Sequence, residues 1–348
     1  MEHSPGAEYW IALANVDGVG PARARKLFET HGSIQAAWRA ASGAVTEAAA
    51  RAELAGLDRA GVQVLTWDDE LRYPRHLRHI ANPPVVLYLT GELTQADEIA
   101  VAIVGTRSPT AYGRQVAQRL ATQLAAKGVT IVSGLARGID AEAHRAALAA
   151  GGRTIAVLGS GLDVIYPREH AGLAREIAKH GAVVSDYPLG AKPDAVHFPA
   201  RNRIVAGLSL GTIVVEAGDT SGALITARMA AEQGRDVFAV PGSIFSKQSY
   251  GVHRLIQDGA KLVADVQDVL DELNLGMVAH QLEMPAAAPT ADDPIEQALL
   301  GTLSTDPQHI DELARLAQLP MAQVSSALTL MELKGLVRQV GALSYVTA

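Results

Sequence analysis

The sequence contains no cysteine, which excludes a disulfide framework, thiolate metal sites and a cysteine nucleophile, and is consistent with a reducing compartment. Aromatic residues are scarce, at 4% of the chain, and only four of them are Phe. No run of about 18 apolar residues occurs, and the residues after Met1 lack the basic and apolar regions of a secretion signal. We therefore expect a cytoplasmic protein with no membrane span.

The chain is long and apolar enough to bury at least one full core, since 48% of its 348 residues are hydrophobic. Its net charge of −7 argues against a general polyanion binder, but the charge is uneven. Residues 1–100 carry 9 basic and 13 acidic side chains, residues 101–270 carry 18 and 14, and residues 271–348 carry 3 and 10. A nucleic-acid site would therefore lie in the middle segment, unless the bias is only chance variation of surface charge.

The first 65 residues have a helical pattern with short breaks. The break at residues 16–21 reads Val-Asp-Gly-Val-Gly-Pro and is followed by Arg23, Arg25 and Lys26, which is typical of a helix-hairpin-helix or SAM-like module. Such a hairpin presents backbone N–H groups at a helix N-terminus, where a phosphate binds well. Because the segment is net acidic, a packing or protein-contact role is an equally good interpretation.

From Trp67 onward, short apolar runs alternate with helical stretches. Strands that are apolar throughout, separated by helices, predict a Rossmann-like, doubly wound and mostly parallel sheet with both faces covered. We assign this domain to residues 66–275. The predicted strands are residues 85–89, 101–104, 129–132, 154–158, 182–184, 212–215 and 237–240.

Residues 276–293 are rich in Ala and Pro and are predicted to be a linker. Beyond it, residues 294–348 show three helical patterns followed by an alternating hairpin that closes at Gly341 and Ala342, which predicts a winged helix. The expected recognition helix, residues 321–333, contains no Lys or Arg. This favours a protein-contact or packing role over base readout.

Two glycine-containing loops follow the first two strands of the parallel set, at residues 105–113 and 133–140. The carboxyl ends of such strands form the ligand crevice of an open α/β sheet, and phosphate is the natural ligand there. Neither loop matches G-x-G-x-x-G or G-x-x-x-x-G-K-[ST], which disfavours an ordinary NAD or ATP site.

Later loops add basic and aromatic side chains to the same edge. Arg168 and Lys192 follow the next two strands, and Phe198 precedes an Arg201-Asn202-Arg203 run. A ring that stacks on bases and arginines that bind phosphates suit a strand with unpaired bases. The alternatives are a core position for Phe198 and pairing of the arginines with carboxylates. Residues 221–227, a small-residue entry to a helix, could bind another anion, but we favour a packing role for them and a bond from Glu216 to the Arg-Asn-Arg helix.

Taken together, these stretches resemble the DNA processing protein A family, also called DprA or Smf. Asp186 is a departure, because the family usually has Glu there, but the charge is kept. The segments that carry the resemblance, in order, are residues 104–107 (Val-Gly-Thr-Arg), 133–140 (Ser-Gly-Leu-Ala-Arg-Gly-Ile-Asp), 143–144 (Ala-His), 166–167 (Tyr-Pro), 198–203 (Phe-Pro-Ala-Arg-Asn-Arg), 221–227 (Ser-Gly-Ala-Leu-Ile-Thr-Ala) and 239–242 (Ala-Val-Pro-Gly).

The resemblance implies a homodimer that binds single-stranded DNA, protects it and helps load RecA recombinase during natural transformation and recombination. It implies no catalysis, cofactor or metal. It assigns phosphate binding to Arg107, pocket lining to Arg168 and Lys192, and base contact to Phe198. The full predicted DNA-binding set is Gly105, Thr106, Arg107, Ser108, Gly134, Arg137, Gly138, Arg168, Lys192, Phe198, Arg201 and Arg203.

Two other functions compete with this interpretation. Rossmann relatives with a similar Gly-Thr…Glu stretch cleave the N-glycosidic bond of nucleoside monophosphates, which would make Glu216 catalytic, but their usual Pro-Gly-Gly-x-Gly-Thr stretch is missing from residues 206–212. A pure protein scaffold is the other. His144 and His197 lie far apart without carboxylates at ligand spacing, so we interpret them as structural or pocket-lining rather than metal ligands.

Overall fold

The structure, a computed structural model, describes residues 3–41, 46–275, 293–303, 308–334, 336–339 and 343–347. The chain divides into two compact units, Met1–Leu282 and Glu283–Ala348, and each is described by itself. Within the described ranges, no helix is long and apolar enough to cross a membrane.

The first unit begins with helices, as predicted, and its described residues form four of them before the first strand. Two of them start at a hydroxyl cap, because the side chains of Ser33 and Thr46 accept hydrogen bonds from backbone N–H groups of the first turn. Trp10 is fully buried and belongs to the same hydrophobic core as Val64 and Tyr88 of the sheet, so the helices pack on the sheet domain. The four helices are α1 (Ala7–Ala14), α2 (Pro21–His31), α3 (Ile34–Ala40) and α4 (Glu47–Arg59).

A nine-stranded sheet follows, in the order β1-β2-β6-β5-β4-β3-β7-β8-β9. All neighbouring pairs are parallel except β1 with β2 and β2 with β6, which are antiparallel. The predicted Rossmann-like, mostly parallel sheet is therefore confirmed. The strands are β1 (Gln63–Thr66), β2 (Val86–Gly91), β3 (Ala100–Val104), β4 (Thr130–Ser133), β5 (Thr154–Val157), β6 (Ala182–Ser185), β7 (Gly211–Val214), β8 (Asp236–Ala239) and β9 (Lys261–Leu262).

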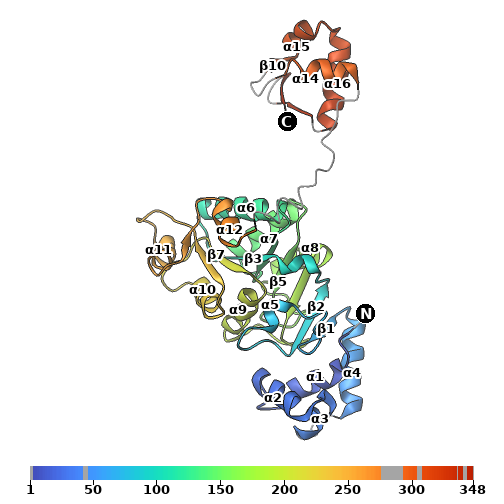
Figure 1. Cartoon of the computed structure of the whole chain (residues 1–348), viewed down its shortest axis with the longest axis vertical. Helices are drawn as coiled ribbons and strands as arrows, with labels where there is room; N and C mark the ends of the chain where they lie inside the picture. Colours follow the sequence, from blue (N-terminus) through green and yellow to red (C-terminus); the bar gives the residue numbers. More distant parts are fainter. Residues whose placement is uncertain are drawn as a thin grey trace. The chain divides into compact units, whose positions relative to one another are not determined.

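Helices cover both faces of this sheet (Figure 1). Along β3, Val101 and Ile103 point into one core and Ala102 and Val104 into the other, which is why the strand is apolar throughout. The first face carries α6 (Ala111–Ala126), α7 (Ile139–Ala149) and α12 (Val266–Glu272), and the opposite face carries α5 (Arg75–Arg78), α9 (His197–Gly207), α10 (Gly222–Glu232) and α11 (Tyr250–Gln257). The remaining elements are α8 (Ala171–His180) and the short 3-10 helices η1 (Gln95–Glu98), η2 (Arg168–His170) and η3 (Lys247–Ser249).

The second unit is a winged helix, as predicted. Its helices enclose a separate core that includes Leu313, Leu328 and Met331. The predicted hairpin turn at Gly341 and Ala342 lies outside the described residues, as does nearly all of the predicted linker. The elements are α14 (Pro294–Leu300), α15 (Ile310–Ala317), α16 (Met321–Leu333), β10 (Gln308–His309), β11 (Val337–Gln339) and β12 (Ser344–Thr347), with strand order β10-β12-β11.

Candidate nucleic-acid interface

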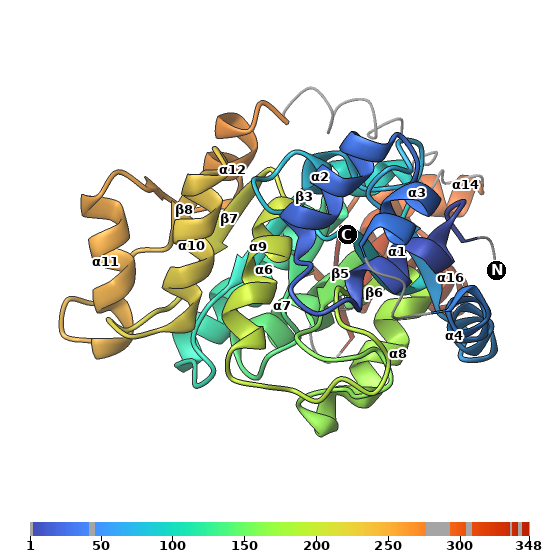
Figure 2. The ribbon, with the colours of Figure 1, turned by 90° about the horizontal axis from the view of Figure 1, so that it is seen from below.

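The direction of strand order reverses between β3 and β7. These two strands are parallel neighbours, but the chain continues from β3 to β4 on one side and from β7 to β8 on the other. In an open α/β sheet, the crevice beyond the carboxyl ends of such strands is where ligands bind. Figure 2 shows the loops that follow β3, β6 and β8 gathered along this edge. A cavity of about 600 Å³ lies there, and it is lined by residues that include Gly105, Thr106, Arg107, Gly134, Phe198 and Arg201.

The loop after β3 is fixed by Glu216, which follows β7 and is 3% exposed. Its carboxylate accepts hydrogen bonds from the backbone N–H of Thr110 at 2.9 Å and from the Thr110 hydroxyl at 2.5 Å. The Thr110 hydroxyl also caps α6 by accepting from Gly113 N. The prediction that Glu216 bonds to the Arg-Asn-Arg helix was wrong. Both of its carboxylate oxygens accept hydrogen bonds from Thr110 and so position the loop that carries Arg107.

The loop after β4 is held by a buried carboxylate. Asp140, at the start of α7, accepts hydrogen bonds from Gly134 N at 3.1 Å and Ala136 N at 3.3 Å. Burial raises the pKa of Asp140, and the nearby Arg201 and these backbone donors oppose that rise. Gly138 has a φ of +78° and lies against Thr106 O, so a side chain there would be strained and would collide with the first loop.

Arg201 stabilises the same loop from inside the wall. Only 5% of it is exposed, and its Nη1 donates hydrogen bonds to Gly134 O, at 2.6 Å, and to Val157 O. The guanidinium leaves no room for a Cβ at Gly134. Burial lowers the pKa of Arg201, while the Asp140 carboxylate favours its charged form. The Arg201 side chain therefore lines the cavity, but its Nη1 group donates to backbone carbonyls and holds the cavity wall in place.

Arg107, by contrast, is exposed at the rim of the cavity. Its guanidinium carbon lies 5.6 Å from the centroid of the half-buried Phe198 ring, and that ring lies 5.6 Å from the ring of Tyr166. An exposed cation beside two rings offers phosphate binding and base stacking in one place. Tyr166, 40% exposed, was absent from the predicted set, although its Tyr-Pro motif was recognised.

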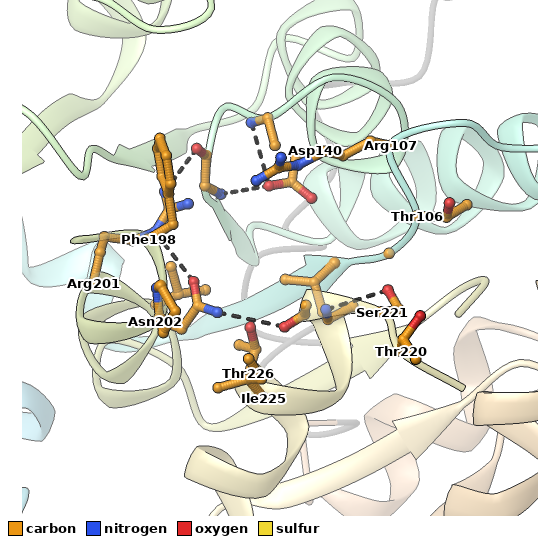
Figure 3. Close-up of a pocket in the computed structure, with 18 of the residues that line it drawn as sticks. Thr106, Arg107, Asp140, Phe198, Arg201, Asn202, Thr220, Ser221, Ile225 and Thr226 are labelled. Atoms are coloured by element: carbon orange, nitrogen blue, oxygen red, sulfur yellow. Dashed lines mark hydrogen bonds between the residues drawn. The ribbon is translucent and has the colours of Figure 1, made fainter. Parts of the chain in front are cut away.

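The far wall of the cavity is the start of α10 (Figure 3). Figure 3 places Phe198, Arg201 and Asn202 on one side and Thr220 and Ser221 on the other. Ser221 caps α10 by accepting from Ala223 N, and Asn202 Nδ2 donates to Gly222 O at 3.5 Å. The sequence signal for this wall was the small-residue run at residues 221–227, for which we favoured packing over anion binding.

The structure does not bring the whole predicted set together. Arg203 faces a different groove, where it binds Asp186 at 2.8 Å. Arg168 and Lys192 are exposed and are not among the residues that line the cavity. Arg137 lies at the rim and pairs with Glu169 at 2.5 Å. Ser108 is exposed on the Arg107 loop, next to the cavity.

Neither histidine singled out in the sequence belongs to a metal cluster, and the described part of the chain holds no group of three or more potential ligands. His144 is fully buried, with Nδ1 2.7 Å from the Thr154 hydroxyl. His197 stacks on Tyr187 with a centroid separation of 4.0 Å.

The hairpin of the N-terminal helices lies against the sheet domain. Arg25 donates to Ala81 O at 3.1 Å, and its guanidinium carbon lies 5.5 Å from the ring of Trp67. The Arg23 guanidinium donates to Gly18 O of the hairpin itself at 3.3 Å. At least one of the three hairpin cations is therefore engaged in packing between the two parts of this unit.

The fold and this edge define a Rossmann-like α/β protein with a switch-point cavity and an appended winged helix. The chain belongs to the DNA recombination-mediator protein A family, whose model matches residues 63–274, and a DprA winged helix domain matches residues 283–342. It is 35% identical to Protein Smf of Synechocystis over 97% of this chain and 98% of that protein. It is 49% identical to the DNA processing protein DprA of Bacillus subtilis over 58% of this chain and 68% of that protein.

Two solved structures are similar. DNA processing protein A of Streptococcus pneumoniae matches with a TM-score of 0.67 and 39% identity, over 78% of this chain and 99% of that one. DNA processing protein A of Helicobacter pylori, described for its single-stranded DNA binding mode, matches with a TM-score of 0.54 and 34% identity, over 59% of this chain and 94% of that one.

Proposed function

We propose that this chain binds single-stranded DNA, without strong sequence preference, in the cavity beyond β3 and β7. The observation that carries the proposal is the exposed Arg107 guanidinium beside the Phe198 ring at the rim of that cavity. An arginine binds a phosphate, and a ring stacks on any base, so the pair suits a strand whose bases are unpaired. The Helicobacter pylori relative, described for its single-stranded DNA binding, supports the same ligand.

The floor of the cavity suits a phosphodiester backbone. The N-terminus of α10 opens onto the cavity through Ser221 and Gly222, and no atom lies within 4 Å of the place that a side chain would take at Gly222, so the main chain there can approach an anion closely. Backbone N–H groups and a helix N-terminus attract phosphate regardless of base identity. This accounts for binding without sequence preference.

We infer that the protein performs no covalent chemistry on the strand. Glu216, the candidate for cleavage of an N-glycosidic bond, is buried and bonded twice to Thr110. The Asp140 carboxylate is likewise occupied by two backbone N–H groups. Release of free base from nucleoside monophosphates by the purified protein would revive the enzyme hypothesis.

We also propose that the chain acts in the cytoplasm as a homodimer that protects incoming single strands and helps load RecA on them in natural transformation and recombination. Membership of the recombination-mediator family supports this role. The measurement is the rate of RecA filament formation on single-stranded DNA with and without the protein, together with its molecular mass by light scattering. An unchanged filament rate would remove the loading role and leave DNA binding standing.

The experiment that tests binding compares a labelled single-stranded oligonucleotide with the matching duplex at two salt concentrations. We expect tight preference for the single strand, with a logarithmic affinity that falls by about 0.7 per phosphate contact for each tenfold rise in salt. Equal affinity for the duplex, or a complex that salt does not weaken, would contradict the proposed site.

A further inference from the structure

Phe245 is the one fully solvent-facing phenylalanine of this protein. Its side chain is 88% exposed and that of the preceding Ile244 is 71% exposed, whereas Phe238 is fully buried and Phe28 and Phe198 are half-buried. Isolated apolar side chains on a surface are ordinary. Phe245 differs from such isolated side chains because its loop also contributes Gln248 to the lining of the cavity.

The segment that carries Phe245 connects β8 to α11 and has a defined conformation. Its start is tied to α6, because the Tyr112 hydroxyl donates to Pro241 O at 2.7 Å. A turn then forms at Ser243, whose carbonyl accepts from Ser246 N at 3.0 Å and whose hydroxyl accepts from Phe245 N at 3.3 Å. These bonds present the ring to solvent from a fixed turn, so little ordering would be needed on binding.

The same segment forms part of the cavity wall. Gln248 lines the cavity together with Thr220 and Ser221, and Lys247 is exposed between Gln248 and the Phe245 turn. Figure 2 shows this loop beside the loop after β3 on the common edge. A strand that leaves the cavity past Ser221 therefore meets a cation and an aromatic ring.

Two loops at this edge thus combine a cation with an aromatic ring. Phe198 lies beside Arg107 at the cavity rim, and Phe245 lies two residues before Lys247 in the loop whose Gln248 lines the cavity. Rings that stack on bases, alternating with cations that track phosphates, are how proteins hold single strands of any sequence.

We propose that Phe245 is a second base-stacking platform, which binds an unpaired base of the same strand as it leaves the cavity, with Lys247 on the adjacent phosphate. The proposal rests on the proposed function and extends it. A duplex keeps its bases stacked inside and has no face to offer the ring, so this platform would favour single strands.

The test uses the full chain and compares Phe245→Ala and Phe245→Trp with wild type on a single strand of about 30 bases and on a matched strand with abasic sites. We expect F245A to lower affinity for the normal strand about tenfold and F245W to preserve it. On the abasic strand all three proteins should bind equally. Leu71→Ala is the matched control, because Leu71 is 97% exposed beside another groove of the molecule.

Three results would overturn the platform. They are wild-type affinity of F245A on the normal strand, an equal loss on the abasic strand, and a changed molecular mass of F245A by light scattering, which would assign the ring to contact between copies of the chain. In each case the proposed function stands if wild type binds single strands and Arg107→Ala binds them about tenfold or more weakly. Failure of wild type to bind any single strand would instead remove the proposed function.

Discussion

Arg107 and Phe198 come from different elements, the loop after β3 and the start of α9, yet the guanidinium carbon lies 5.6 Å from the ring centroid. A cation beside an aromatic face is attracted by the ring quadrupole. The contact holds both side chains at the cavity rim before any ligand arrives. A phosphate and its neighbouring base would then be bound by one preformed pair, and each partner can be tested separately.

Arg107→Ala should lower affinity for single-stranded DNA by about tenfold or more, because a charge-assisted contact to phosphate is lost. The salt dependence should become shallower by about 0.7 in logarithmic slope. Fluorescence anisotropy at several salt concentrations measures both. Arg119→Ala, which removes an exposed charge on α6, is the control. Wild-type affinity of R107A would contradict the assignment.

Phe198→Ala should weaken single-strand binding by about tenfold, and Phe198→Trp should retain it, because any aromatic face can stack on a base. Mobility shift titrations measure the effect. Urea unfolding checks that F198A remains folded. If F198W binds as weakly as F198A while both are stable, the ring acts through packing and not through stacking.

Asp140→Asn should destabilise the first unit by up to about 3–5 kcal/mol, because it removes the negative charge that most favours the charged form of the buried Arg201 and leaves only Asp186. Urea unfolding measures this loss. Arg145→Ala on the same helix removes an exposed, surface-paired charge and should change stability by no more than about 0.5 kcal/mol. Equal stability of D140N and R145A would show that the pair contributes little to the loop.

His144 should make stability depend on pH. Burial, the largest cause, lowers the pKa of His144 to about 3, against about 6.5 in the unfolded chain. Below pH about 6.5, His144 binds a proton in the unfolded chain but not in the folded protein. The free energy of unfolding therefore falls as pH drops from about 6.5 toward 3. Between pH 7.5 and 5.5 this contribution is about 1.4 kcal/mol.

The measurement for His144 is urea unfolding of wild type and His144→Gln at both pH values. The variant should lose less stability than wild type on acidification, by about that 1.4 kcal/mol. The comparison concerns the pH response, so a general destabilisation of the variant does not affect it. Identical pH responses of the two proteins would show that His144 takes up its proton in the folded protein as readily as in the unfolded chain.

The sequence was sufficient for strands β2 to β8 and the order of their loops. A strand such as β3 is buried on both faces, so every residue in it must be apolar, and that pattern is visible without a structure. The glycines at 105 and 134 and the exposed Arg107 follow directly from such strands. Two strands were missed. β1 (Gln63–Thr66) begins inside the segment that we predicted to be helical, and the two residues of β9, Lys261 and Leu262, are both exposed and carry no periodicity.

The binding partners of the polar residues could be assigned only from the tertiary structure. Arg201 and Arg203 are two positions apart on α9, but a helix turns about 100° per residue, so the first enters the wall of the cavity and the second faces Asp186. The local sequence shows that both residues are charged, but it does not show which groups each guanidinium contacts.

The sequence by itself therefore determined the fold class, the family resemblance and the sheet edge at which we propose that a ligand binds, because periodicity and glycine placement are local properties. Only the tertiary structure decided that Glu216 bonds to Thr110, 106 residues away, and that Gln248, in the loop that carries Phe245, lines the cavity. Such contacts depend on which loops meet at the carboxyl edge once the strands have taken their order β4-β3-β7-β8. Strand order is a property of the whole packed sheet.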